Sequence, residues 1–173
     1  MKFKTRDIVI LGTYLALLLS AQVALAWVSG VEIITVLFLS FCYCYGIGRG
    51  VFLACAFSLL RCIIFGFYPP AVMLYLIYYN FFAIIVGAVG NAFKHQFSIK
   101  ILLCVIALCL ILTVVFTLLD NLITPLFFKF NHETANAYFY ASLPTMLAQL
   151  ISVGVSVSAL FYPLRKALFS FAD

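Results

Sequence analysis

Charged residues are scarce in this 173-residue chain. Asp, Glu, Lys and Arg together make up 9% of it, whereas hydrophobic residues make up 67%. Because soluble domains carry about 25% charged residues, the composition excludes a soluble globule and indicates an integral membrane protein. A membrane span takes about 20 apolar residues, so this length accommodates about six helices and leaves no room for an extramembrane domain.

The chain also lacks the motifs of soluble and metal-dependent chemistry. It has no GxxxxGK phosphate loop and no CxxC pair, and its apolar runs hold no HxxH or Ser–His constellation. The six cysteines lie within apolar runs, where they act as small hydrophobes. His95 and His132 are expected in loops, without the ligand cluster that a metal needs. We therefore expect no cofactor, no metal site, no enzymatic activity and no nucleic-acid partner.

Apolar runs separated by turn and basic residues predict one all-α domain over 1–173, a compact bundle of six transmembrane helices. The approximate helices are 8–27, 33–45, 51–65, 71–93, 101–128 and 137–164. The second and third are short and are joined by the glycine-rich return GIGRG at Gly46–Gly50. Such short segments are shielded by longer helices or thin the membrane locally, unless the helices extend into the glycines. Pro125 is expected to kink or end the fifth helix, and Arg165 and Lys166 to stop the sixth.

The basic residues predict the orientation, since cytoplasmic loops carry an excess of Lys and Arg. The two termini and every second loop lie on one side of the membrane, and this side holds Lys2, Lys4, Arg6, Arg49, Lys94, Lys100, Arg165 and Lys166. The opposite side holds only Lys129. An even number of spans then places both termini in the cytoplasm, and it places most polar and aromatic helix residues toward the outer side.

Arg61 is the most unusual of these polar residues, because it lies inside an apolar run. An arginine in hydrocarbon costs at least about 2.5–3.5 kcal/mol, so we expect it to be paired. Asp120 or Glu32 would supply the partner, and such a pair could hold a carboxylate, phosphate or amide of a ligand. The alternative is an ion pair with a structural role only.

Tyrosines and amides complete the expected outward-facing pocket, which would be sealed on the inner side. Tyr75, Tyr78 and Tyr79 follow one another at helical spacing, although each could equally serve packing or the membrane interface. Gln149 fits either a pocket wall or a bond between helices. The full set of candidate substrate-binding residues is Glu32, Arg61, Tyr68, Tyr75, Tyr78, Tyr79, Asp120, Asn121 and Gln149.

Small residues repeat every four positions along the first helix, at Gly12, Ala16, Ser20 and Ala24. A stripe of this kind lets a second helix approach closely, which is how helices associate in lipid. The stripe predicts either packing inside the bundle or docking of another protein.

Taken together, the chain resembles the S components of energy-coupling factor (ECF) transporters, which are small bacterial membrane proteins that capture vitamins. The resemblance covers essentially the whole length. It rests on the basic start and small-residue first helix, GVEIITVLFLSFCYCYGIGRG, the FGFYPP turn, and the closing ASLPTMLAQL and YPLRKAL segments.

The resemblance implies a substrate-binding subunit of the bacterial cell membrane. It would bind a B vitamin or related micronutrient on the outer side, with relatives of cobalamin, pyridoxine or pantothenate as candidates. Its partners would be a membrane-embedded T component, docked on Gly12, Ala16 and Ser20, and two ATPase subunits that power uptake. This stripe departs from the paired alanines usual in the family. Two other classes stay open, a homo-oligomeric channel or exporter and an intramembrane enzyme.

Overall fold

The computed structural model describes residues 5–28, 30–93 and 96–170, so Lys2, Lys4, Lys94 and His95 lie outside the described residues. Within that part of the chain there are five helices: α1 (Thr5–Ala24), α2 (Ile34–Phe65), α3 (Pro69–Ala92), α4 (Ile99–Phe128) and α5 (His132–Ser170). Each is long and apolar enough to cross a membrane. The all-α class is confirmed, and the helices indicate a multi-pass membrane protein.

The helices expected over 33–45 and 51–65 form one element, α2, because helical geometry resumes directly after a single break. That break is at Gly46, whose φ of 76° and ψ of −176° lie outside the helical region. Glycine adopts a positive φ without the penalty that a side chain would bring. The two arms of α2 fold back on each other, since the rings of Phe38 and Phe57 are only 6.1 Å apart although 19 positions separate them. The structure therefore differs from the six separate helices of the prediction.

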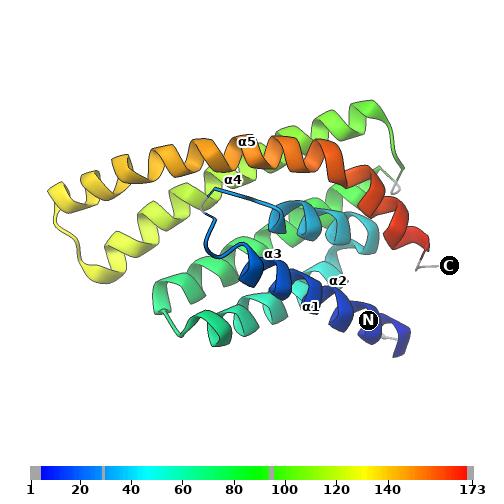
Figure 1. Cartoon of the computed structure of the whole chain (residues 1–173), viewed down its shortest axis with the longest axis horizontal. Coiled ribbons are helices and arrows are strands. Elements are labelled where there is room, and N and C mark those ends of the chain that lie inside the picture. Colours follow the sequence, from blue (N-terminus) through cyan, green and yellow to red (C-terminus); the bar gives the residue numbers. More distant parts are fainter. Residues whose placement is uncertain (1–4, 29, 94–95, 171–173) are drawn as a thin grey trace.

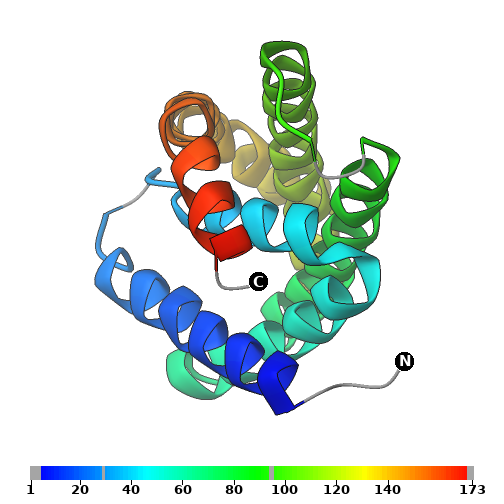
Figure 2. The ribbon, with the colours of Figure 1, turned by 90° about the vertical axis from the view of Figure 1, so that its right-hand side faces the viewer.

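The segments run back and forth along the long axis of the molecule (Figure 1). The connections α1–α2, α2–α3 and α4–α5 lie toward one end, on the left in Figure 1, which we call the loop end. The start of α1, the Gly46 break and the last turn of α5 lie toward the other, which we call the terminal end. Figure 2 looks from the terminal end and shows α1 lying along one side of the other helices.

The first arm of α2 occupies the centre of the molecule. Every residue from 34 to 43 is buried, as expected of a helix that is apolar on all sides. The ring of Phe38 packs against the rings of Tyr79 and Phe82 of α3, and the ring of Tyr43 packs against that of Phe161 of α5. This arm is thus shielded by the longer helices, as the first explanation of its short length expects.

Two helix ends differ from the sequence expectations. Helix α5 begins at His132, not at 137, because the Asn131 side chain accepts a hydrogen bond from the Thr134 N–H at 2.8 Å and caps the helix. It also continues past Arg165 and Lys166 to Ser170. The prediction that these two residues stop it was wrong. The helix continues for another turn, in which Phe169 lies under the Arg165 guanidinium with Cζ 4.8 Å from the ring centroid. Pro125 lies inside α4, which ends three residues later at Phe128.

Helices α2 and α3 approach closely beside the Gly46 break. A Cβ on Gly87 would lie 2.6 Å from the backbone nitrogen of Ile47, so no side chain fits there. In contrast, a Cβ on Gly154 of α5 would meet nothing within 4 Å. Gly87 and Gly154 both lie within helices, and only Gly87 has no room for a side chain.

We expect Gly87→Ala to lower the stability of the folded protein by about 1–3 kcal/mol, because the added methyl must push α3 away from α2. Gly154→Ala is the matched control. It should be neutral or stabilising by up to about 1 kcal/mol, because alanine favours helices. Thermal unfolding in detergent measures both, and equal midpoints for the two variants would contradict this packing.

Candidate ligand site

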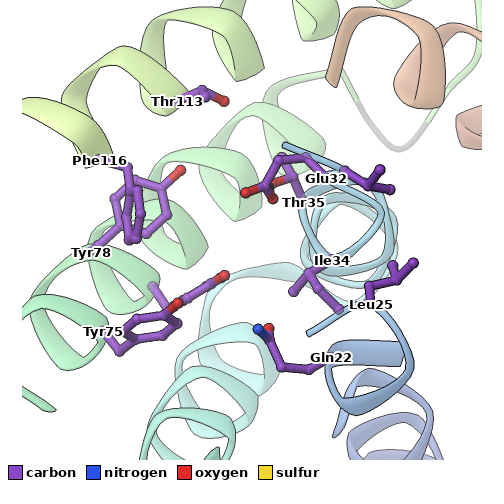
Figure 3. Close-up of a pocket in the computed structure, with 11 residues that line it drawn as sticks. Gln22, Leu25, Glu32, Ile34, Thr35, Tyr75, Tyr78, Thr113 and Phe116 are labelled. Carbon is purple, nitrogen blue, oxygen red and sulfur yellow. Dashed lines mark hydrogen bonds between the residues drawn. The ribbon is translucent and has the colours of Figure 1, made fainter. Parts of the chain in front are cut away.

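A cavity of about 60 Å³ opens among α1, the α1–α2 connection, α2, α3 and α4. Figure 3 shows that the carboxylate of Glu32 and the hydroxyl of Tyr78 point toward each other across this space. The residues that line it are Gln22, Leu25, Val31, Glu32, Ile34, Thr35, Tyr75, Tyr78, Tyr79, Thr113 and Phe116. Tyrosine rings and a few polar groups around one space are typical of a small-molecule site.

Glu32 connects this cavity to α5. Its Oε2 accepts a hydrogen bond from Thr35 Oγ1 at 3.0 Å, and its Oε1 accepts one from Gln149 Nε2 at 3.3 Å. Its backbone N–H donates to Ser152 Oγ at 2.8 Å, and its carbonyl accepts from Ser156 Oγ at 3.1 Å. The residue is thereby fixed to α5 by side chain and backbone alike.

Burial of the Glu32 carboxyl raises its pKa above the ordinary value, and the hydrogen bond from Thr35 partly offsets this shift. The raised pKa means that the ionised form is less stable here than in water. A positively charged group nearby would lower the pKa again.

Four aromatic rings form the opposite wall. Tyr78 lies edge-on to Phe116 of α4 with ring centroids 4.8 Å apart, and Tyr75 lies 5.4 Å from Tyr79 and 5.8 Å from Phe116. Within the described part of the chain, no hydrogen bond is made by the hydroxyls of Tyr75, Tyr78 and Tyr79. These hydroxyls are therefore available to a ligand.

Arg61 does not form the expected ion pair. Among the described residues the only ion pair is Arg49–Asp7, at 3.0 Å, near the terminal end. The Arg61 guanidinium instead lies over the ring of Tyr75, with Cζ 3.7 Å from the centroid, and its buried Nε has no hydrogen-bond partner. An aromatic face compensates part of the cost of a buried cation, which explains how Arg61 is accommodated.

Asp120 and Asn121 serve the contact between α4 and α5. The Asp120 carboxylate accepts hydrogen bonds from Thr124 Oγ1 and from Tyr138 OH, both at 2.8 Å. Asn121 Nδ2 donates to Ser142 Oγ at 2.8 Å. Neither residue lines the cavity. Their neutral partners account for the missing pair between Asp120 and Arg61.

The structure thus brings together part of the predicted set. Glu32, Tyr75, Tyr78 and Tyr79 line the cavity, and Gln149 reaches it through Glu32. Arg61 stands behind Tyr75. Asp120 and Asn121 lie on the α4–α5 contact, and Tyr68 stacks on Phe128 with centroids 5.6 Å apart.

Sequence reasoning missed Gln22, Thr35, Thr113 and Phe116 as wall residues. Thr113 and Phe116 lie three positions apart on α4 and so share one face. A threonine and a glutamine within apolar runs were the available signals, but both types also occur as helix-to-helix contacts.

The small-residue stripe of α1 is not covered by the other helices. Gly12, Ala16 and Ser20 are exposed, and a Cβ on Gly12 would meet nothing within 4 Å. Leu11, Tyr14 and Leu18 on the other face are buried, and Tyr14 OH donates to the Leu37 carbonyl at 2.7 Å. The structure therefore speaks against the first interpretation of the stripe, which was packing inside the bundle.

No group of three His, Cys, Asp or Glu side chains that could hold a metal ion occurs in the part of the chain that the structure describes. The site's chemistry is that of hydrogen bonding, one carboxylate and aromatic faces.

The α1–α2 connection also packs tightly against α5 at Gly30. A Cβ there would lie 2.8 Å from Cβ of Ala148, and φ is +87°. We expect Gly30→Ala to detach the connection, because neither the backbone conformation nor the contact tolerates a methyl. Hydrogen exchange of residues 25–33 should then rise about tenfold or more.

Gly66→Ala is the control for this experiment, because Gly66 also has a positive φ, of +91°, but nothing within 4 Å of its Cβ. It should leave exchange in 25–33 unchanged. A similar rise in both variants would show that backbone strain, not contact with α5, holds the connection.

Comparison of the chain with family models, with curated proteins and with solved structures gave no match. The resemblance to the S components therefore rests on the sequence patterns quoted above.

Proposed function

We propose that this protein is the substrate-binding S component of an ECF-type importer. In this function it captures a B vitamin or related micronutrient at the outer side of the bacterial cell membrane. The cavity carries the proposal: one carboxylate and three unpartnered tyrosine hydroxyls surround a space that the α1–α2 connection covers. Polar groups of this kind are costly within an apolar bundle unless they find a hydrogen-bond partner, and a bound ligand would supply one.

The arrangement of the segments supports the proposed topology. The start of α1 and the end of α5 lie at the same end of the molecule (Figure 1), and Arg49 and Arg165 lie on segments that reach that end. If each arm of α2 spans the membrane, the chain crosses it six times with both termini in the cytoplasm. The cavity then opens toward the outside.

The exposed face of α1 supports a docked partner. Its small residues offer close approach to another membrane helix, without a hydrophobic driving force. In the proposed function this partner is the T component, which is coupled to two ATPase subunits. No catalytic role is assigned to this chain.

The first test is a search for a captured solute. We expect the purified protein to retain a small molecule that mass spectrometry of the released fraction identifies. Tyr78→Leu should reduce the retained amount about tenfold or more, because it removes a ring and a hydroxyl from the cavity wall. Phe127→Leu, at an exposed position on α4, is the control and should retain the wild-type amount. Equal retention by both variants would reject the cavity as the site.

The second test concerns the docking face. We expect Ala16→Leu to abolish co-purification with a T component and its ATPases, because the larger side chain prevents close helix contact. Ala141→Leu changes an exposed alanine of α5 in the same way and is the matched control. If both variants co-purify with the partners as the wild type does, the face of α1 is not the docking site.

A further inference from the structure

Glu32 faces the cavity with no positively charged partner. Its carboxylate oxygens accept hydrogen bonds from Thr35 and Gln149, which are both neutral. Among the described residues it takes part in no ion pair. A partly buried carboxylate usually has a counter-charge, because removing a charge from water is costly. The protein itself provides no positive charge beside Glu32, and a bound ligand could supply one.

The wall opposite Glu32 suits a cation as well. The faces of aromatic rings carry negative electrostatic potential and attract ammonium groups. Tyr75, Tyr78, Tyr79 and Phe116 line the cavity together, and the three tyrosine hydroxyls can accept hydrogen bonds from an N–H. An anion in this space would meet the carboxylate on one side and the ring faces on the other.

The other charges near the cavity do not reverse this balance. Tyr75 interacts electrostatically with Arg61, Glu32 and Asp120, which are one positive and two negative groups. Arg61 lies over the ring of Tyr75 and does not line the cavity. Among the described residues that line the cavity, Glu32 is the only one with a carboxylate or a basic group, and a carboxylate attracts cations.

We propose that the cavity binds a small organic cation, whose ammonium group pairs with Glu32 and lies against the tyrosine rings. This inference rests on the proposed function and narrows its substrate to solutes with a protonated amine or a quaternary ammonium group. The cavity of about 60 Å³ is the proposed position of this head group.

Glu32 also has a structural role, and the experiment has to separate the two. Glu32→Gln removes the charge and keeps one acceptor oxygen. Its NH2 group replaces the other oxygen and can donate to Thr35 Oγ1 or to the side-chain oxygen of Gln149. Glu133→Gln is the matched control, because Glu133 is an exposed carboxylate in the first turn of α5. Thermal unfolding of both variants reports whether the fold is retained.

The probes are choline and its neutral isostere 3,3-dimethylbutanol, titrated into the full chain in nanodiscs and followed by saturation-transfer NMR. We expect the wild type and Glu133→Gln to bind choline about tenfold or more tightly than the alcohol. Glu32→Gln should lose this preference while binding the alcohol as before. Tyr78→Phe should keep the preference, and Tyr78→Leu should weaken it.

Three results would overturn the cation inference: equal affinity for both probes, no choline binding by the wild type, or an unchanged preference in Glu32→Gln. The solute retained by the purified protein separates this failure from failure of the proposed function. A neutral or anionic solute that is lost in Tyr78→Leu overturns only the cation inference. If no solute is retained and neither probe binds, both proposals fail.

Discussion

The rest of the structure depends on the burial of the first arm of α2. A helical arm with ten consecutive buried residues must be covered on all sides, and the covering elements are α1, the second arm of α2, α3 and α5. The second arm can contribute only because the chain reverses at Gly46, where glycine tolerates the positive φ. Gly87 lets α3 come close to the same break. The apolar centre and the sharp reversal are thus two aspects of one constraint.

This constraint also explains where the polar chemistry can lie. The residues of this arm that line the cavity, Ile34 and Thr35, lie at its N-terminal end. Glu32 stands just before that end, where the positive end of the helix dipole favours a carboxylate by about 0.3–1 kcal/mol. That contribution is smaller than the cost of taking a charge out of water. Hydrogen bonds from Thr35 and Gln149 help, but the raised pKa of the Glu32 carboxyl indicates that compensation is incomplete.

The sequence was enough to predict the helical class, the apolar segments and the reversal at GIGRG, because hydropathy and glycine act locally. It also singled out Glu32 and the tyrosines of α3, which line the cavity, since polar residues in apolar runs are conspicuous. The sequence did not predict the contact that Arg61 makes with the ring of Tyr75. Whether an arginine meets a carboxylate or a ring depends on how two helices are rotated about their axes, which composition does not specify. For the same reason Asp120 could not be assigned to Tyr138, which lies on another helix.

Helix α1 joins the two proposed binding surfaces. Its buried side is anchored through Tyr14 to the Leu37 carbonyl, and its exposed side carries the small-residue stripe. Its last turn brings Gln22 to the cavity, and Leu25 follows directly after the helix. A rigid helix cannot be displaced at one of these places without moving the other. A partner that shifts α1 would therefore change the cavity wall, and a ligand that fixes the wall would restrain α1. Because such coupling is reciprocal, ligand affinity and partner affinity must change by the same factor.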